Sequence, residues 1–268
     1  MTGWTEMGDG VFVRRYESLD LNIGAILCGD GVVLVDTRGA HVQARELVAD
    51  LRSITRLPVA AVVNTHHHWD HTFGNAVFSG APIWGHARCA ETLRTHGEDM
   101  RRQVKEWAPR HADVFDEVVI TPPDHVVFTS ESLLVGNRRI ELRHLGRAHT
   151  DNDLVVKVPD ANVVFAGDLV EESAPPSFGD AYPLEWPETL ASLLTHCTGP
   201  VVPGHGATVG INFVEDQHAE LIEVRRLATE RHGQGMPVDA AADAGGPYPA
   251  NVLRVAFERA WLQLGGGA

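Results

Sequence analysis

The stretch His66-His67-His68-Trp69-Asp70-His71 places four histidines and one aspartate within six residues. It follows the apolar run 58–63, which predicts a buried strand. Neutral imidazole nitrogens and carboxylate oxygens are ligands that transition metals take in proteins. The stretch therefore predicts a metal site at the end of a strand, where a rigid base holds the ligands and leaves positions open for water and substrate.

Three further candidate ligands follow short apolar runs and lie beside or near glycine. They are His149 after the run 140–145, Asp168 after 163–166, and His205 after Val201-Val202. Glycine near a strand end lets the chain approach a ligand closely, and open sheets place their chemistry at such ends. Any one of these residues alone is typical of a structural role, but together with the stretch 66–71 they indicate one metal site.

This set of residues resembles that of the metallo-β-lactamase superfamily, in the family's order and with its separations. The resemblance runs from about residue 22 to about residue 210. It includes the segment 32–37 followed by Gly39, which is similar to the family's early strand with its structural Asp. The resemblance implies an α/β fold, a four-layer αββα sandwich with a dinuclear metal site at one edge of the sheets.

The resemblance also implies a role for each ligand. One Zn²⁺ would be held by His66, His68 and His149, the second by Asp70, His71 and His205, and Asp168 would bridge both. Residues two apart in an extended segment point the same way, so His66 and His68 can converge on one ion. Iron or manganese could occupy the same ligands.

The chemistry expected of such a site is hydrolysis. A hydroxide between the two metals forms readily, because zinc lowers the pKa of bound water towards about 7. It would attack the carbonyl of an ester, thioester, lactone or lactam without a Ser or Cys nucleophile. Asp70 is the ligand expected to matter most for catalysis, because it holds the second metal.

Three neighbouring residues have alternative interpretations. His67 and Trp69 are not predicted ligands, because alternation points them away from His66 and His68; core packing or a hydrogen bond to a ligand is favoured. Asp36 is interpreted either as orienting a ligand histidine or as part of a local turn. The remaining histidines are expected on the surface or in loops.

The sequence predicts the substrate less precisely than it predicts the metal ligands. Glyoxalase II-like and lactonase-like members of the superfamily share the full ligand set. After Asp168 the chain departs from the Gly-Cys-Gly-Arg-like run of glyoxalase II, and β-lactamases of the superfamily usually carry Cys or Ser at this position. A glutathione thioester and a dedicated β-lactamase are therefore disfavoured, whereas promiscuous β-lactam turnover stays open. Lactonases also use a Tyr, for which Tyr182 is the candidate.

Two alternative functions and the roles of two segments are not decided by the sequence. A mononuclear iron oxidoreductase of the persulfide-dioxygenase type could use part of the same ligand set, and a non-catalytic metal-binding role is a further alternative. The segment 171–186 either forms one wall of the substrate pocket or packs its aromatic residues onto the following helix. The polar segment 87–107 is a lid, a dimer face or a solvated surface, and the oligomeric state is not predicted.

The composition of the chain limits the classes of partner that it can bind. The formal net charge of −14 disfavours nucleic acid and anionic membranes as partners, and the resemblance implies a small-molecule substrate. A bound dinuclear centre would still make the pocket locally positive. Three dispersed cysteines indicate no disulfide framework, and Cys28 and Cys197 are expected to be small buried residues. The chain start resembles no signal peptide and no run is apolar enough to span a membrane, so a cytoplasmic location is expected.

The order of predicted elements favours one domain over 1–268, with a core at about 10–210 and a helical C-terminal elaboration at about 211–264. Strands are predicted at 11–15, 21–28, 32–36, 58–63, 125–128, 132–136, 139–145, 152–157 and 161–166. Helices are predicted at 41–54, 87–107, 187–196, 213–231 and 251–264. The helix 213–231 is expected to be exposed, 233–249 to be a loop, and 251–264 to cap the core.

Overall fold

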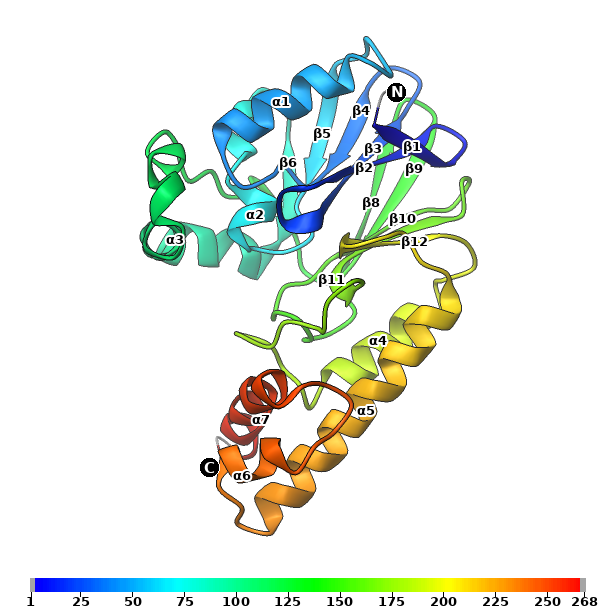
Figure 1. Ribbon diagram of the computed structural model, residues 1–268. Helices are drawn as coiled ribbons and strands as arrows, with labels where there is room; N and C mark the ends of the chain where they lie inside the picture. Colours follow the sequence, from blue (N-terminus) through cyan, green and yellow to red (C-terminus); the bar gives the residue numbers. More distant parts are fainter. Residues whose placement is uncertain (1–2, 266–268) are drawn as a thin grey trace.

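Two β-sheets packed face to face form the centre of the structure (Figure 1). It is a computed structural model that describes residues 3–265. The strands of the first sheet are β1 (Trp4–Gly8), β2 (Val11–Tyr16), β3 (Leu21–Leu27), β4 (Val32–Val35), β5 (Val59–Val63), β6 (Ile83–His86) and β7 (His125–Val127). The strands of the second sheet are β8 (Ser130–Val135), β9 (Arg138–Arg143), β10 (Val155–Val158), β11 (Val163–Glu171) and β12 (Val201–His205).

The strand order makes the two sheets continuous at one edge. It runs β7-β6-β5-β4-β3 through the first sheet and β12-β11-β10-β9-β8 through the second, while β2 joins β1 to β3. A single residue pair, His205 with Leu21, connects β12 to β3. This pairing brings a candidate ligand of the second sheet to the edge of the first.

Branched aliphatic side chains fill the space between the sheets. Ile26 and Val33 of the first sheet and Ile140 and Val156 of the second are fully buried in one cluster. Burial of such a side chain contributes about 1.5–3 kcal/mol relative to full exposure. Because successive residues of a strand point to opposite faces, the outer face of each sheet is left for helices.

Helices cover both outer faces, so the expected four-layer αββα sandwich is confirmed (Figure 1). On the first sheet, α1 (His41–Leu51) buries Ala44, Leu47 and Leu51. The second sheet is covered by α4 (Trp186–Leu194) and α5 (Ile211–Gly233), and α7 (Ala250–Gly265) packs against α5 and against α6 (Val238–Asp243) (Figure 1).

Shorter elements and one long helix surround the predicted metal loop. They are η1 (Ser18–Asp20), α2 (Trp69–Thr72), η2 (Asn75–Phe78), α3 (Ala87–Trp107) and η3 (Pro109–Phe115). The segment 87–107 is one continuous helix. Its Leu93 and Val104 share a small apolar cluster with Phe73 and Phe115, so α3 is anchored next to the metal loop.

Several predicted elements differ from the structure. The short strands β1 and β6 are absent from the sequence prediction, and β10 begins at Val155 rather than at 152. The prediction of an exposed helix over 213–231 is wrong, because α5 buries residues such as Leu221 and Val224. The predicted loop 233–249 contains α6, which buries Ala241 and Ala242. Alanine and dispersed apolar residues among many charges give a weak helical pattern, so only packing reveals these faces.

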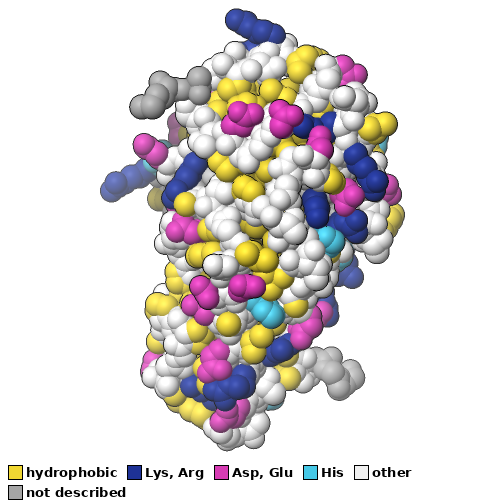
Figure 2. Space-filling view, turned by 90° about the vertical axis from the view of Figure 1, so that its right-hand side faces the viewer, with side chains coloured by type: hydrophobic (Ala, Val, Ile, Leu, Met, Phe, Trp, Pro, Cys, Tyr) yellow, Lys and Arg dark blue, Asp and Glu magenta, His cyan; other side chains and the backbone are white. Residues whose placement is uncertain are grey.

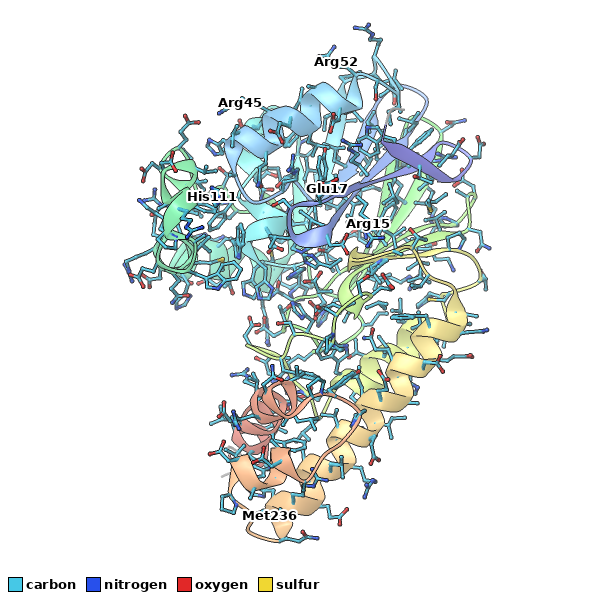
Figure 3. All side chains as sticks on the ribbon, viewed as in Figure 1. Arg15, Glu17, Arg45, Arg52, His111 and Met236 are labelled. Atoms are coloured by element: carbon cyan, nitrogen blue, oxygen red, sulfur yellow. The ribbon has the colours of Figure 1, made fainter. Side chains whose placement is uncertain are left out.

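Two of the remaining histidines contradict the expectation of a surface position. His41 is buried and accepts a hydrogen bond from the backbone N–H of Val119 (3.2 Å). His86 is buried and donates from Nε2 to the carbonyl of Phe128 (3.1 Å). His111, in contrast, is exposed on η3 beyond the end of α3 (Figure 3).

The C-terminal helix packs as predicted. On α7, Leu253, Ala256, Phe257 and Ala260 are buried, which confirms that this face caps the core. The three cysteines are free and buried, which confirms the expectation for Cys28 and Cys197. The division into a core and a C-terminal elaboration stays a prediction.

The surface carries charges of both signs. On the face shown in Figure 2, acidic and basic side chains lie among hydrophobic ones, without a broad area of one charge. Within residues 3–265, no helix combines the length and the apolar character that crossing a membrane requires.

Candidate metal centre

The metal-ligand motif begins where β5 leaves the first sheet. β5 lies parallel to both β4 and β6, and its last residue is Val63. The buried side chains of Asn64 and Asn75 then exchange hydrogen bonds from Nδ2 to Oδ1, at 3.0 and 2.8 Å. This amide pair fixes the direction of the loop before it reaches His66.

Four of the predicted ligands form a first group. Nε2 of His149 lies 3.0 Å from Nδ1 of His68 and 3.4 Å from Oδ2 of Asp168. Nε2 of His66 lies 3.5 Å from the same oxygen. One ligand atom from each of the four side chains lies within 4.8 Å of all the others, so the group can hold one metal ion.

The other three predicted ligands form a second group. Nε2 of His205 lies 3.3 Å from Oδ2 of Asp70 and 3.3 Å from Nε2 of His71. Asp168 faces this group too, with Oδ2 at 3.4 Å from Nε2 of His205 and Oδ1 at 3.4 Å from Nε2 of His71. Its carboxylate therefore stands between the two groups, in the position of a bridging ligand.

The distances between ligand atoms test whether metal ions fit. Two ligands of a tetrahedral zinc ion, each about 2.0–2.1 Å from the metal, lie roughly 3.3 Å apart. The separations are 3.0 to 3.5 Å in the first group and 3.3 to 3.6 Å in the second, where Oδ2 of Asp70 lies 3.6 Å from Nε2 of His71. Within the described chain, His66 Nε2 and Asp168 Oδ1 are buried without a hydrogen-bond partner, which an ion would explain. The seven side chains fit a pair of metal ions.

Asp36 orients two of the ligand histidines, in agreement with one interpretation of the sequence. Its Oδ2 accepts hydrogen bonds from Nδ1 of His71 and Oγ1 of Thr65, both at 2.8 Å, and its Oδ1 accepts from the Thr65 N–H at 2.8 Å. Oγ1 of Thr65 in turn accepts from Nδ1 of His66 at 3.0 Å. Nε2 of each ring therefore faces the centre.

Asp180 is a residue of the site that the sequence analysis missed. Both of its carboxylate oxygens lie 3.2 Å from Nε2 of His68. Burial lowers the pKa of His68, but the hydrogen bond with Asp180 and the charge of that carboxylate outweigh burial and raise it to about 9. Asp180 thus keeps a proton on Nε2 and leaves Nδ1 of His68 facing His149. The sequence offers one signal for such a residue: a metal-binding histidine generally needs a hydrogen-bond acceptor for its second ring nitrogen.

Carboxylates dominate the electrostatics of the centre. Burial lowers the pKa of His205, but the charge of Asp168 and hydrogen bonds with Asp168 and Asp70 outweigh burial and raise it to about 12. Burial and the charge of Asp168 raise the pKa of Glu171 to about 8, and its Oε1 lies 3.6 Å from Nδ1 of His149. Because metal-binding histidines must be neutral, metal binding displaces protons from this centre.

Asp168 lies inside a strand rather than after one. β11 continues to Glu171 because it pairs in parallel with β12, with register shifts at Gly167 and Glu171, so the predicted strand end at 166 is wrong. On β12, a Cβ added to Gly204 would lie 1.8 Å from Oδ1 of Asp168. The glycine before His205 therefore leaves room for the carboxylate between the two ligand groups.

A cavity of about 910 Å³ opens over the metal centre. His68, Asp70, His149, Asp168 and His205 contribute to its lining. Part of α3 forms one wall of the cavity, as expected of a lid, and the alternative of a dimer face stays a prediction. The cavity volume lies within the range of about 300–1,000 Å³ that is typical of small-molecule sites.

The segment 171–186 forms a wall of this cavity only in its first part. The lining residues of this part are Glu171, Glu172, Ser173, Ala174, Ser177, Gly179 and Asp180. Phe178 and Trp186 are instead buried against each other, with ring centroids 5.4 Å apart. The packing interpretation is thus correct for these two aromatic residues.

Tyr182 does not take the place of a lactonase tyrosine. Its ring contacts two guanidinium groups, with its centroid 4.5 Å from Cζ of Arg147 and 5.8 Å from Cζ of Arg259. Tyr182 is not among the described residues that line the cavity.

His67 and Trp69 are held by contacts outside the two ligand groups. Nδ1 of His67 accepts a hydrogen bond from Nδ2 of Asn152 (2.8 Å), and its Nε2 lies 3.3 Å from Asp180. Trp69 packs edge to face against Phe115, with ring centroids 5.5 Å apart. His67, His68 and Asp180 also lie close enough to hold an ion, but their mutual hydrogen bonds account for that approach.

The chain is similar in sequence to known proteins of one superfamily. The profile of the metallo-beta-lactamase superfamily matches residues 22–230. The chain is 25% identical over 192 residues to metallo-beta-lactamase IND-1 of Chryseobacterium indologenes, over 69% of this chain and 71% of that protein. It is 27% identical over 183 residues to a metallo-beta-lactamase type 2 of Bacillus sp. (strain 170), over 66% of this chain but only 63% of that protein.

A solved structure has the same fold. The structure of metallo-beta-lactamase FIM-1 from Pseudomonas aeruginosa, in its mono-zinc form, superimposes with a TM-score of 0.61 at 21% sequence identity, over 82% of this chain and 94% of that one. The αββα sandwich with its His/Asp metal site is that of a metal-dependent hydrolase. The chain belongs to the metallo-beta-lactamase superfamily.

Replacing Asp180 by Asn is expected to weaken metal binding about 10- to 100-fold, the usual cost of losing the partner of a ligand histidine. The amide removes the charge that holds a proton on Nε2 of His68. Competition with a chromogenic chelator measures the affinity. Asp160→Asn is the control, because Asp160 is paired with Arg138 outside the cavity. Equal affinities in the two variants would show that Asp180 does not orient the ligand.

Proposed function

We propose that this protein is a dinuclear zinc hydrolase that cleaves an ester, thioester, lactone or lactam bond of a small molecule. The observation that supports the proposal best is the meeting of two ligand groups at one carboxylate. His66, His68 and His149 stand on one side of Asp168, and Asp70, His71 and His205 on the other. The mono-zinc form of the related FIM-1 supports zinc as the metal.

The ligand residues would bind two ions with different sets of side chains. Three histidines and Asp168 would hold the first ion, and Asp70 would give the second a charged oxygen ligand next to His71 and His205. When bound, the ions supply a water that loses its proton near neutral pH and a Lewis acid for the carbonyl oxygen. Asp36 and Asp180 hold His71 and His68 in place, so that the ligands are positioned before substrate arrives.

Removing the metal is expected to abolish hydrolysis. The test substrates are an aryl ester, a homoserine lactone, an acyl-glutathione thioester and a chromogenic cephalosporin, the last because the two curated relatives are named metallo-beta-lactamases. At least one substrate should be turned over by the zinc-loaded protein, lost with EDTA and regained with added zinc. Elemental analysis should give two zinc ions per chain.

Two results would contradict the proposal. Hydrolysis that survives exhaustive chelation would show that the metal centre is not the catalyst. One iron per chain, together with oxygen consumption in the presence of a persulfide and no hydrolysis of any substrate, would favour the alternative of a mononuclear iron oxidoreductase. In that case the group Asp70, His71 and His205 would not hold a catalytic metal.

A further inference from the structure

One stripe of α3 faces the cavity. The lining residues of this helix recur every three or four positions and are Thr92, His96, Asp99, Met100, Gln103, Val104 and Trp107. The buried Cys89, Leu93 and Gly97 fall on or next to this same side, and the opposite side carries exposed charged residues such as Glu98 and Arg102. Residues spaced in this way share one side of a helix, so the side that anchors α3 next to the metal loop also reaches the cavity.

Trp107 is an exposed apolar side chain in this wall of the cavity. It is the last residue of α3 and is 70% exposed, although indole is among the side chains that gain most from burial. Its ring lies edge to face with that of Trp69, 6.3 Å between centroids, and Trp69 is part of the metal-ligand motif. Trp107 is therefore held next to the metal loop with much of its surface free for an apolar group.

Leu19 brings a second apolar side chain to the cavity. It is 41% exposed, and its backbone adopts a left-handed conformation (φ 63°), which is strained for a leucine. Its carbonyl accepts a hydrogen bond from Nδ1 of the ligand His205 at 2.7 Å. The same strained turn thus holds a metal ligand and presents a leucine to the substrate.

The described lining of the cavity contains no Lys or Arg, whereas Asp20, Asp99 and Glu172 are part of it. Asp20 and Asp99 are paired with arginines that are not among the lining residues, Arg15 at 2.6 Å (Figure 3 labels Arg15) and Arg102 at 2.7 Å. A carboxylate on the substrate would lose water without gaining a counter-ion from these walls, which is costly.

We propose that the substrate is an uncharged ester or lactone whose apolar chain or ring lies along the α3 wall against Trp107 and Met100. This inference rests on the proposed hydrolytic function and names the substrate class of that site. The metal centre would recognise the carbonyl, and the α3 wall would select the acyl portion.

A matched set of aryl esters tests the proposal on the zinc-loaded protein. 4-Nitrophenyl octanoate is compared with the acetate and with the mono-4-nitrophenyl ester of suberic acid, which has the same chain length and ends in a carboxylate. The octanoate should have the highest kcat/KM, at least about tenfold above the suberate. In Trp107→Ala, the octanoate-to-acetate ratio of kcat/KM should fall about tenfold, as expected for a lost aromatic platform.

Phe128→Ala is the matched control, because Phe128 is also 70% exposed but does not line the cavity. This variant should keep the wild-type ratio. Equal kcat/KM for octanoate and suberate, or an unchanged ratio in Trp107→Ala, would overturn the proposal while leaving the hydrolytic function intact.

A binding measurement separates the two hypotheses. The neutral ketone 2-nonanone cannot be hydrolysed, so it reports binding alone. It should change the tryptophan emission of the wild type much more than that of Trp107→Phe. If no ester is turned over and this difference is present, the hydrolytic function fails and the apolar binding wall stands. If esters are turned over and the emission of both proteins responds equally to 2-nonanone, the wall at Trp107 is refuted.

Discussion

Asp70→Ala is expected to lower kcat/KM more than about 100-fold, beyond the usual cost of losing a group that only orients a ligand. Oδ2 of Asp70 lies 3.3 Å from Nε2 of His205 and 3.6 Å from Nε2 of His71. Burial raises the pKa of Asp70, but the charges of the two histidines outweigh burial and lower it, so the carboxylate is ionised at neutral pH. Alanine leaves the second metal with two imidazoles and no charged ligand of its own.

The variant is measured in three ways. Zinc per chain should fall towards one, kcat/KM should collapse for every substrate of the panel, and near-UV circular dichroism should match the wild type. Asp160→Ala is the control, because it removes an aspartate outside the cavity. Near-normal turnover of Asp70→Ala with a single zinc per chain would mean that the second metal is not needed for catalysis.

Trp186→Ala is expected to have the largest effect on stability, about 3–5 kcal/mol, as for other buried tryptophans replaced by alanine. Trp186 is fully buried at the start of α4, and its Nε1 donates to the carbonyl of Leu169 at 3.2 Å. Its ring also lies 5.8 Å from that of the ligand His149. The substitution would leave a cavity between the second sheet and its helices and remove one of the two side-chain hydrogen bonds to the Leu169 carbonyl.

Urea denaturation of the zinc-free proteins measures this loss without the contribution of metal binding. The melting temperature should fall by roughly 10 °C, since about 2–4 °C are lost per kcal/mol in a chain of this size. Trp107→Ala is the matched control, because its exposed ring should cost no more than about 0.5 kcal/mol. If the two tryptophans cost the same, Trp186 does not anchor the helical layer to the sheet.

The ligand motif could be predicted from the sequence because its information is local. His66 to His71 are adjacent in the chain, and the apolar run before them predicts the strand that carries them. His149, Asp168 and His205 could be added because each follows an apolar run next to or near glycine. The structure brings all seven together, and their binding of metal remains a proposal that the zinc measurements test.

Other parts of the site depend on contacts between distant segments. Asp180 reaches His68 across 112 residues of sequence, and nothing next to Asp180 marks it as a partner of a ligand. The strand carrying Asp168 continues past it only because β12 pairs alongside. Charged residues dominate α3, so its sequence is compatible with a lid, a dimer face or a solvated surface.

The sequence by itself determined the candidate ligands and most strands, because short-range spacing and hydrophobic alternation depend on neighbouring residues alone. The αββα class could be expected from it through the resemblance to a family that these ligands carry. The tertiary structure decided which residues surround the metal centre: Asp180 and not Tyr182, and the α3 wall with Trp107 and not Phe178 or Trp186. The physical reason is that an aromatic residue gains burial equally well in a core or in a pocket wall. Only the packing of neighbouring elements determines whether its free face meets protein or substrate.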